Sequence, residues 1–522
     1  MGRRPSHVIQ MECSSLDPVK ALCDGAKRFI KAERKGIRNG VFEFEAEGEV
    51  CTCQRIYEEF GIAIVDLNPE EFAKIKNAKG VRQVAENRIR SLPQYAFEML
   101  QQPESAGLGQ RAKKFDDHDG LGIRARNNGT VFRRSSGQTV FHRRSQQTVF
   151  AGRSRQTINR RGKRINSFEG FTPDPSLNST RDLVSYIQGQ RDALNSVLRL
   201  MEESGSNFDT ERYAYLDDGL TWALHAVGLA SNDYPFSGKG VRVAVLDTGV
   251  SLKHPDLTAP AVARSGNRKR ARLSRSLLTD CVSGDRSPND LNGHGSHCAG
   301  LIGGPRSTLH QNGFRYSVSP DSEMIISKVA DDRGIATDGD IIEGISFATE
   351  NKARVISLSI GEPRGSGDAC DPLFEHLADC LLNGRVGHPK GCLIFAAAGN
   401  GSTSEVIAPV DNPAACSKIV SIGAINPDGS IASFSNGQTD SEGAVDFCAP
   451  GVDILSTHLE DGFAIMTGSS MAVPIAAGVA ALHFEKNPEL DAQEIWKSME
   501  RTATPLGPRA LYGNGLVQSP WP

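Results

Sequence analysis

The sequence predicts an α/β protein whose largest unit is a doubly wound, mostly parallel sheet. Over residues 207–522, short apolar runs alternate with stretches of helical period. The apolar runs are rich in Val, Ile and Ala at consecutive positions, which is typical of strands buried on both faces. Strands of this kind, joined by helical crossovers, form a parallel sheet with helices on both sides. Chemistry in such sheets gathers at the carboxyl ends of the strands.

The expected strands of this unit are VRVAVLDTG (241–249), EMIISKVA (323–330), ARVISLSIG (353–361), CLIFAAAGN (392–400) and KIVSIGA (418–424). Helices are expected at DGDIIEGISFATEN (338–351), at DPLFEHLADCLLNG (371–384) and over a run that includes IAAGVAAL (475–482). The first two helices lie between consecutive strands, where a parallel sheet needs its crossover connections.

Residues 7–90 predict a second, smaller α/β unit. Strands are expected at HVIQMEC (7–13), FGIAIVDL (60–67) and VRQVAEN (81–87). Helices are expected at 17–35, where apolar residues recur near a period of 3.6, and at 68–78, which begins with Asn-Pro. The predicted organisation is therefore a small domain at 1–95, a connector at 96–206 and a large domain at 207–522.

The connector contains a repeat. Nearly the same nine residues recur as TVFRRSSGQ, TVFHRRSQQ and TVFAGRSRQ over 130–156, and a decayed copy ends the repeat region (130–164). Twelve Lys and Arg and no acid lie between residues 124 and 164, so the rest of the chain carries about −15 against a net charge of −3. Such a block is typical of a solvated segment, and it also suits an anion-binding arm or a phosphorylated regulatory segment. A helix is expected at 179–203.

The composition, the N-terminal residues and the cysteines indicate the class of protein and its expected location. With 39% hydrophobic and 23% charged residues, the chain is globular, and its length allows two or three domains. The first fifteen residues lack the apolar core of a secretory signal, and no apolar run is long enough to span a membrane. The eleven cysteines show neither a disulfide framework nor a paired metal motif. A cytoplasmic protein with reduced thiols is therefore expected, with leaderless export as the alternative.

Three segments carry the residue types of a catalytic site. Asp247 ends the strand expected at 241–249 and is followed by Thr-Gly. His294 lies in DLNGHGSHCAG, where the flanking glycines let the backbone come close to another group. Ser470 lies in MTGSSMAVP, where a glycine-bearing turn enters an apolar helix. Taken singly, each residue has a structural explanation such as a helix cap; together they form an Asp, His, Ser set on a parallel sheet.

This set, with AAGN (397–400), resembles the subtilases, the subtilisin-like serine proteases. The resemblance spans about 210–520 and includes the segments HPDL, ISLSIG, ASFSN and APGVDILS. It implies a serine endopeptidase that acts on protein or peptide substrates through an acyl-enzyme intermediate. Ser470 would be the nucleophile, His294 the base and Asp247 the residue that orients it, with Asn400 as the oxyanion donor.

The sequence departs from the family at several positions. Ser469 stands where threonine is usual and Ile475 where histidine is common, and neither change removes a catalytic group. His297 falls where the family has a structural histidine, so it has no expected catalytic role. Asp256 matches a calcium ligand of the family, but the calcium loop expected after His294 is replaced by GGPRSTLHQNGFRYS. The resemblance therefore implies no required cofactor and gives calcium at Asp256 little support.

The N-terminal unit is similar to the end of a subtilase propeptide over FGIAIVDLNPEEFAKIKNAKGVRQVAENR. The resemblance implies a ferredoxin-like domain that assists folding and then inhibits the enzyme by placing its tail in the cleft. In the family the enzyme cuts this tail itself, which predicts a self-processed zymogen. The repeats then lie in an exposed connector that offers Val-Phe and Arg-Arg sites for cleavage or docking.

The resemblance also predicts where substrate binds. Two segments would pair with the substrate strand, namely Asp332, Arg333 and Gly334, and Ser359, Ile360 and Gly361. The pocket for the residue before the cut bond would have its floor near 410–414. A small apolar floor would accept Phe or Leu, whereas a carboxylate at Asp411 would pair with Arg or Lys. The loop length leaves both versions open and favours a surface position for Asp411.

A nucleic-acid-binding arm on an inactive scaffold is the main alternative function, because of the basic repeats. The complete triad and the lack of a recognised nucleic-acid-binding fold argue against it. Neither a nucleic-acid nor a membrane partner is therefore expected, and the unit at 1–95 is the expected intramolecular partner.

Overall fold

The computed structural model describes residues 7–11, 37–38, 41–46, 49–57, 60, 62–65, 81–92, 96–99, 133–135, 138–140, 157–158, 164–165, 219–229, 234–258, 260–261, 270–271, 273–283, 287–306 and 315–521. The helices expected at 17–35, 68–78 and 179–203 lie outside these residues, so they stay predictions.

The largest sheet has seven strands in the order β16-β17-β13-β19-β20-β21-β22, and every neighbouring pair is parallel. Its strands are β13 (Arg242–Asp247), β16 (Leu278–Asp280), β17 (Glu323–Lys328), β19 (Val355–Leu358), β20 (Leu393–Ala397), β21 (Val420–Ile425) and β22 (Phe447–Pro450). The prediction of an α/β fold with a large parallel sheet is confirmed. The short strands β16 and β22 add one strand at each edge beyond the predicted runs.

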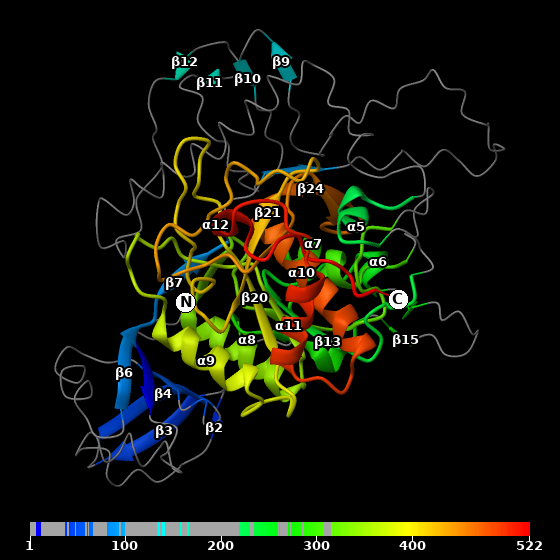
Figure 1. Ribbon diagram of the computed structural model, residues 1–522. Helices are drawn as coiled ribbons and strands as arrows, with labels where there is room; N and C mark the ends of the chain where they lie inside the picture. The colour runs from blue at the N-terminus through cyan, green and yellow to red at the C-terminus, as the bar shows by residue number, and fades with distance from the viewer. Residues whose placement is uncertain are drawn as a thin grey trace, which may run out of the picture.

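Helices surround this sheet (Figure 1). The longer ones are α7 (His294–Gly303), α8 (Asp338–Glu350), α9 (Pro372–Leu382), α10 (Ser469–Lys486) and α11 (Ala492–Thr502). The shorter ones are α5 (Trp222–Ala226), α6 (Pro255–Thr258), the 3-10 helix η2 (Arg275–Leu277) and α12 (Arg509–Tyr512).

Both faces of the sheet are covered because its strands are apolar at successive positions. Val243 and Val245 of β13 belong to a hydrophobic cluster that includes α7 and α10. Ala244 and Leu246 of the same strand belong to a second cluster, which includes α8 and α9. Alternate side chains of a strand point to opposite faces, so this central strand is buried from both sides.

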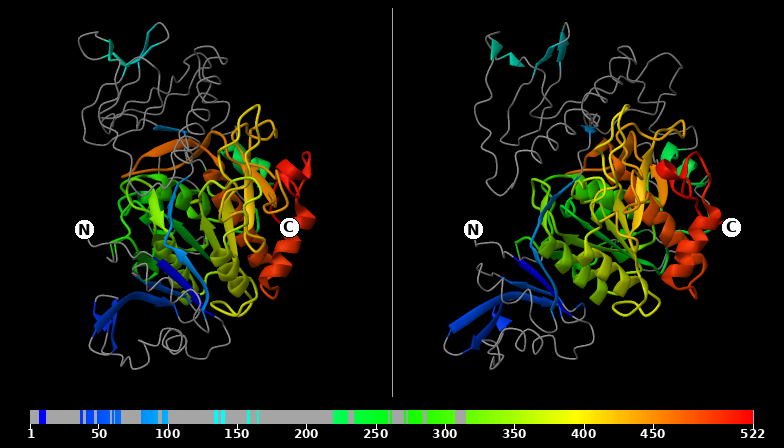
Figure 2. Two further views of the ribbon diagram at one scale, coloured as in Figure 1. Left: turned by 90° about the vertical axis from the view of Figure 1, so that its left-hand side faces the viewer. Right: turned by 60° about the vertical axis from the view of Figure 1, so that its left-hand side comes forward.

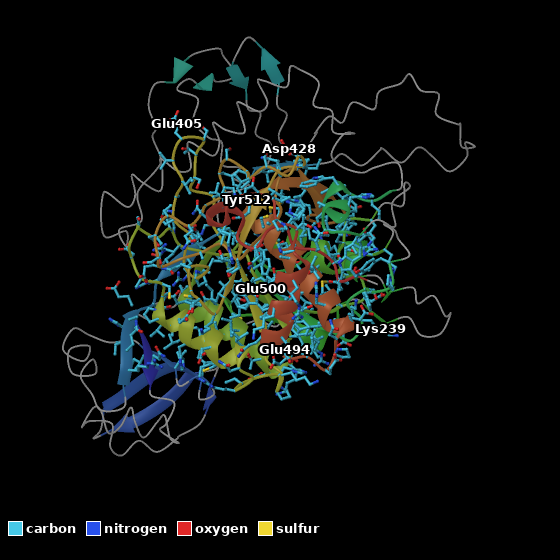
Figure 3. The ribbon with its side chains drawn as sticks, viewed as in Figure 1. Lys239, Glu405, Asp428, Glu494, Glu500 and Tyr512 are labelled. Atoms are coloured by element: carbon cyan, nitrogen blue, oxygen red, sulfur yellow. The ribbon has the colours of Figure 1, made fainter. Side chains whose placement is uncertain are left out.

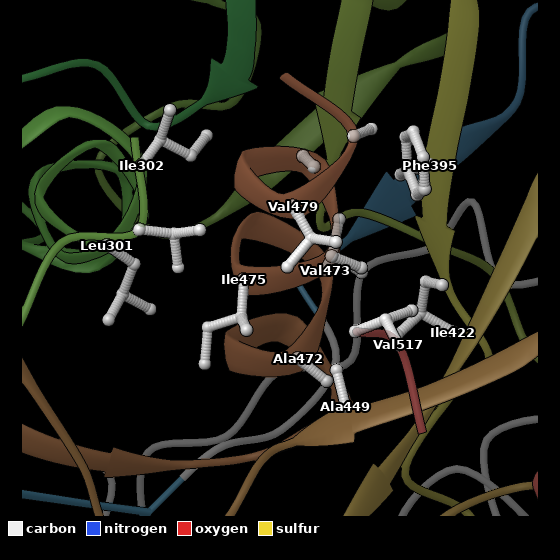
Figure 4. Packing of buried hydrophobic residues seen from close by; sticks show 14 of the residues in the cluster. Leu301, Ile302, Phe395, Ile422, Ala449, Ala472, Val473, Ile475, Val479 and Val517 are labelled. Carbon is white, nitrogen blue, oxygen red and sulfur yellow. The ribbon is translucent and has the colours of Figure 1, made fainter. Parts of the chain in front are cut away.

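Helix α10 lies inside the first cluster. Its residues from 469 to 484 are all buried. In Figure 4, Ile475 and Val479 of α10 lie between Leu301 of α7 and Phe395 of β20. A helix that is apolar on all sides is stable only when it is enclosed, so the position of its first residues is set by packing on every side.

Helix α11 is amphipathic by contrast. Ile495 and Met499 are buried against the first cluster, whereas Glu494 and Glu500 are exposed, as Figure 3 shows. Its N-cap Asp491 accepts a hydrogen bond from the Glu494 amide at 2.8 Å. This helix therefore closes the outer surface over α10.

The N-terminal residues build a second sheet with the order β2-β3-β4-β5-β1-β6, antiparallel throughout. Its strands are β1 (His7–Met11), β2 (Ile37–Arg38), β3 (Val41–Ala46), β4 (Glu49–Tyr57), β5 (Ile62–Val65) and β6 (Val81–Glu86). Strands β1, β5 and β6 lie within the predicted runs, and β2 to β4 lie outside them.

This sheet lies beside α8 and α9 (Figures 1 and 2). Val8, Phe60 and Ile64 belong to the same hydrophobic cluster as the two helices. The ring of His376 on α9 lies with Nε2 3.0 Å from the Phe60 carbonyl oxygen. The N-terminal unit therefore packs on the helices that cover one face of the large sheet.

After β6, two short strands pair with segments of the unit that contains the large sheet. β7 (Ile89–Ser91) pairs antiparallel with β18 (Ile335–Thr337). β8 (Ala96–Met99) is an antiparallel third strand on the hairpin of β23 (Ile454–Thr457) and β24 (Phe463–Thr467). Three further pairs are β9 (Arg133–Ser135) with β10 (Gln138–Val140), β11 (Thr157–Ile158) with β12 (Arg164–Ile165), and β14 (Pro260–Ala261) with β15 (Arg270–Ala271).

Two further expectations concern cysteines and membrane spans. The cysteines at 281, 298, 370, 380, 392, 416 and 448 are free thiols. Among the described residues, no helix combines the length and the hydropathy that crossing a bilayer requires.

Candidate active site

Asp247 lies at the carboxyl end of β13, which has β17 and β19 as its neighbours. Its carboxylate is buried, and Oδ1 accepts a hydrogen bond from the Thr248 amide at 2.7 Å. The same oxygen lies 2.8 Å from Nδ1 of His294. The strand end therefore holds the carboxylate in one orientation and presents it to the histidine.

His294 is the first residue of α7, and the next residue holds this helix end against β13. The Gly295 amide donates to the Thr248 hydroxyl at 2.9 Å. A Cβ at Gly295 would lie 2.3 Å from the Gly249 carbonyl oxygen, so any larger residue would push the helix away. This contact confirms the predicted close backbone approach beside His294 and brings the ring to Asp247.

Ser470 is the second residue of the buried helix α10. Its carbonyl oxygen accepts a hydrogen bond from the Ser359 hydroxyl at 2.9 Å. Cys298 of α7 joins the two helices, because its Sγ lies 3.7 Å from that carbonyl oxygen and 3.8 Å from Nδ1 of His294. The hydroxyl of Ser470 is buried, without a hydrogen-bond partner among the described residues. Burial raises the pKa of Cys298 well above its ordinary value, so this thiol stays protonated.

Asn400 follows β20 and lies next to the start of α10. Its Oδ1 accepts hydrogen bonds from the Ser469 amide at 2.8 Å and from the Ser469 hydroxyl at 2.7 Å. These bonds fix which way the side-chain amide is turned, so its NH2 group is directed away from Ser469. Serine at position 469 thus makes the hydroxyl contact that orients Asn400.

Asp411 is buried rather than at the surface, so the favoured surface position is wrong. Only 8% of the residue is exposed, and its amide donates to the Ala398 carbonyl oxygen at 2.9 Å. Its Oδ1 accepts a hydrogen bond from the side-chain Nδ2 of Asn436 at 2.9 Å. Gly399 has a φ of +110°, and a Cβ there would lie 2.3 Å from Oδ2 of Asp411. Burial raises the pKa of Asp411 to about 8.

The predicted pocket floor is assembled around this residue. Val410, Asn412 and Ala414 are all buried. Glu362, next to the segment ISLSIG, exchanges two backbone hydrogen bonds with Asn412, at 2.8 and 3.0 Å. The structure therefore holds 410–414 by backbone hydrogen bonds to Glu362, directly after ISLSIG (356–361), and to Ala398 of AAGN (397–400).

Two of the predicted substrate-binding residues contact the N-terminal tail, meaning the described residues 89–92 and 96–99. Ser91 and Gly361 exchange two backbone hydrogen bonds, at 3.2 and 3.1 Å. The Leu92 amide donates to the Gly334 carbonyl oxygen at 2.9 Å. The tail is thus held as an added strand between the two predicted segments.

The other predicted substrate-binding residues have different partners. Asp332 lies 2.8 Å from Nζ of Lys328. Arg333 pairs with Asp331 at 2.8 Å. Ser359 binds the backbone of Ser470, and Ile360 is buried in the core. The strand β18, which follows Gly334, makes the longer pairing with the tail.

Sequence analysis missed an acidic pocket beside the tail. Three carboxylates surround the guanidinium of Arg90, from Asp338, Glu362 and Asp371. The ring of Phe374 lies 4.7 Å from Cζ of Arg90. Asp371 is also the N-cap of α9, with Oδ1 accepting from the Leu373 amide at 3.0 Å. In the sequence Asp338 and Asp371 look like ordinary helix-start residues, and no local pattern joins them to Glu362.

Two further predicted residues lie outside the reacting groups. His297 is buried, with Nε2 2.9 Å from the Ile454 carbonyl oxygen, and burial lowers its pKa to about 3. Asp256 is buried and accepts from the Tyr316 hydroxyl at 3.0 Å. Among the residues with described side chains, Asp256 belongs to no group of three acidic, histidine or cysteine side chains that could share an ion. The Tyr316 contact occupies one carboxylate oxygen of Asp256, calcium there stays a prediction, and no step below depends on calcium.

Comparison with known proteins identifies relatives of this catalytic unit. The subtilase family profile matches residues 238–515. Subtilisin BL of Lederbergia lenta is 34% identical over 304 residues, which are 58% of this chain and 97% of that protein. Subtilisin DY of Bacillus licheniformis is 32% identical over 282 residues, 54% of this chain and 90% of that protein. The intracellular serine protease of Paenibacillus polymyxa is 35% identical over 291 residues, 54% of this chain and 79% of that protein.

These relatives correct the expected location. The prediction of a cytoplasmic protein is contradicted, because the subtilisin relatives are mostly secreted extracellular proteases. One relative is named an intracellular serine protease, so the family occurs on both sides of the membrane. The cytoplasmic prediction rested on the composition of residues 1–15, and that composition does not decide the location.

Proposed function

The chain belongs to the subtilase family and is a serine-type endopeptidase, and from that premise we propose that Ser470, His294 and Asp247 are its catalytic triad. The observation that carries the proposal is the buried contact of 2.8 Å between Nδ1 of His294 and Oδ1 of Asp247. A serine hydroxyl is a poor nucleophile near neutral pH until a base accepts its proton. His294 is the proposed base, and Sγ of Cys298 lies 3.8 Å from its Nδ1 and 3.7 Å from the Ser470 carbonyl oxygen.

In the proposed reaction, Oγ of Ser470 attacks the carbonyl carbon of a peptide bond while its proton passes to Nε2 of His294. Asp247 keeps the other ring proton on Nδ1 and stabilises the imidazolium. His294 then gives its proton to the leaving amine, which departs and leaves an ester on Ser470. A water molecule, deprotonated by the same histidine, releases the acid product and restores the serine.

The carbonyl oxygen becomes negatively charged in this reaction, and Asn400 is the proposed donor to it. The two hydrogen bonds from Ser469 to Oδ1 turn the NH2 group of Asn400 away from Ser469. The Ser470 amide at the beginning of α10 is the second donor. Donors fixed before the reaction stabilise the developing charge without reorganising.

The N-terminal unit is proposed to be an intramolecular inhibitor. If β2 and β3 are left out, its strands lie side by side in the order β6, β1, β5, β4. Numbered along the chain, this order is 4-1-3-2, which is that of a ferredoxin-like sheet. Ser91 pairs with Gly361, and β8 pairs with β24, which ends three residues before Ser470. The tail thus contacts the segment that includes Ser359, which binds the Ser470 carbonyl oxygen, and the strand that leads to Ser470, as a bound substrate strand would.

The protein is further proposed to be a zymogen that processes itself. The tail has to leave the cleft before another polypeptide can bind, and a cut in the connector at 96–206 would release it. The Arg-rich repeats at 130–164 are candidate sites for this cut. Removal of the connector lowers the effective concentration of the tail at the cleft.

Asp411 is proposed to select the residue before the cut bond. Its buried carboxylate lies beside Gly399, next to the proposed oxyanion donor. A carboxylate at the end of a pocket pairs with Arg or Lys and excludes acidic side chains. The charged form of Asp411 is needed for this pairing.

The test compares the wild type with Ser470→Ala and with Ser441→Ala, which changes an exposed serine. We expect the wild type and Ser441→Ala to cleave denatured casein and to lose mass at the N-terminus on storage. Ser470→Ala should do neither and should keep the mass of the full chain. Casein cleavage by Ser470→Ala at the wild-type rate would exclude Ser470 as the nucleophile.

A further inference from the structure

The acidic pocket around Arg90 is buried, unlike a surface ion pair. The Arg90 side chain is fully buried, and the side chains of Asp338 and Asp371 are nearly so. Nε of Arg90 donates to Asp338, and its two terminal nitrogens lie 3.4 Å from Glu362 and 2.6 Å from Asp371. Each guanidinium nitrogen therefore has a carboxylate of its own.

The pocket is built from three separate parts of the catalytic unit. Asp338 is the first residue of α8, Asp371 caps α9, and Glu362 follows the segment that pairs with the tail. Phe374 in the first turn of α9 covers the guanidinium with its ring. Planar fork geometry and aromatic stacking favour a guanidinium over an ammonium group.

The charge balance shows that the pocket requires a cation. Burial alone would lower the pKa of Arg90, but the three carboxylates outweigh burial and raise it, so the arginine stays charged. Arg88 adds a weaker contact, with NH1 3.2 Å from Asp371, and its side chain is partly exposed. Without Arg90, three carboxylates would face one partly exposed arginine.

The register of the tail makes Arg90 equivalent to a substrate residue. Arg90 directly precedes Ser91, which forms the two-bond bridge to Gly361, and it lies in β7, which pairs with β18. A substrate held as an added strand on the same segments would place its corresponding side chain in the same pocket. That side chain lies on the amino-terminal side of the cut bond, because the chain reaches β24 only at Ala96.

We propose that this pocket selects polypeptide substrates with arginine at the position of Arg90, directly before the residue that pairs with Gly361. This inference rests on the proposed function of the cleft and names its substrate class. The enzyme therefore acts on arginine-bearing extended segments, and the tail inhibits it by presenting the preferred side chain. The repeats at 130–164 supply many arginines of this kind within the same chain.

The first experiment lets peptides compete for the purified full-length protein. The peptides carry the sequence 87–98, with Arg, Lys, Leu or the neutral isostere citrulline at position 90. The ratio of two kcat/KM values in one mixture does not depend on how many active sites the tail leaves open. We expect arginine to exceed citrulline by about 10-fold or more, with lysine between them. Equal rates for arginine and citrulline would overturn the proposal and leave the protease assignment intact.

Variants then assign the preference to the pocket. Asp338→Asn and Glu362→Gln should each lower the arginine-to-citrulline ratio by about 10-fold. Asp379→Asn is the matched control, because it removes a carboxylate from α9 that pairs with Arg385 outside the pocket. The Glu362 side chain is over a third exposed, so its substitution is the safer one for folding. Unchanged ratios in both pocket variants would overturn the proposal.

A binding measurement separates this inference from the proposed catalysis. The full chain carrying Ser470→Ala and Arg90→Leu has no nucleophile and a weakened tail. Fluorescence anisotropy of the labelled peptides should show the arginine peptide binding about 10-fold or more tightly than the citrulline peptide. Equal binding, or no binding of either peptide, would contradict the pocket even if the wild type proves to be an active protease.

Discussion

The catalytic centre and the acidic pocket both bury carboxylates beside a basic group, but they hold that group differently. Asp247 offers one oxygen to one nitrogen of His294, a ring that has to gain and lose a proton in each cycle. The pocket surrounds Arg90 with three carboxylates, and an arginine keeps its charge throughout. One carboxylate orients a base, whereas three bind a permanent cation. Under the proposed function, reaction and selectivity depend on separate acids, which can be changed independently.

Asp247→Asn is expected to show the largest difference between its effect on kcat and its effect on arginine selectivity. Asparagine preserves the shape but stabilises the wrong tautomer of His294, so kcat should fall by about 10⁴-fold. The arginine-to-citrulline ratio should stay at its wild-type value, because the pocket is untouched. Cleavage rates of the arginine and citrulline peptides give both kcat and the arginine-to-citrulline ratio. A near-normal kcat would mean that Asp247 does not orient the base.

Asn400→Ala should produce the next largest effect. Loss of one oxyanion donor is expected to lower kcat by about 10²–10³-fold with little change in KM. Ser469 loses its partner in the same variant, so the melting temperature has to be measured beside the rate. A rise in KM at constant kcat would instead assign Asn400 to substrate binding.

The two regions also differ in how far they could be predicted. The large sheet follows from runs of apolar residues, and the catalytic set follows from three motifs that each lie at an element end. The acids at 338, 362 and 371 come from three distant segments, and two of them resemble ordinary helix-start residues. Only the folded chain brings them around Arg90, so local sequence contains no signal for the pocket.

Two other misses have local causes. Strands β3 and β4 were absent from the predicted elements, although VFEFEA alternates apolar and acidic residues with the period of a strand. Asp411 was placed at the surface because the loop between Asn400 and β21 has no length rule. Its burial depends on the exact return of the chain to Ala398.

Arg90→Leu tests the acidic pocket, and we expect its effect on peptidase activity to be of intermediate size. Loss of the guanidinium leaves three facing carboxylates, so the tail should bind less tightly and the peptidase activity of freshly purified full chain should rise about 10-fold. Arg82→Leu is the matched control, since it removes an exposed arginine from β6 of the same unit. Equal activities of the two variants would show that Arg90 does not hold the tail in the cleft.

The smallest expected effect is a pH dependence that distinguishes Asp411 from the arginine pocket. Asp411 has a pKa of about 8, so its charged fraction rises from about one tenth at pH 7 to about nine tenths at pH 9. Preference for Arg over Leu directly before the cut bond should therefore increase several-fold over this range. Arg364 and Glu362 act on Asp411 with opposite signs, and Asn436 donates to it.

The pocket should behave differently over the same pH range. Burial raises the pKa of Asp338 to about 6 while Arg90, which opposes the rise, occupies the pocket, so the carboxylate that pairs with an arginine is charged at pH 7. The arginine-to-citrulline ratio at position 90 should therefore stay constant between pH 7 and 9. In Asp411→Asn, the preference directly before the cut bond should become independent of pH. A pH-independent preference in the wild type would remove Asp411 from the specificity pocket.

The most direct test of the central claim is covalent labelling of the nucleophile. A fluorophosphonate reacts with a serine only when a neighbouring base activates the hydroxyl. Peptide mapping by mass spectrometry should place the label on Ser470 in the wild type, with labelling strongly reduced in Asp247→Asn and absent from Ser470→Ala. A label on another serine, or equal labelling of Asp247→Asn and wild type, would contradict a triad of Asp247, His294 and Ser470.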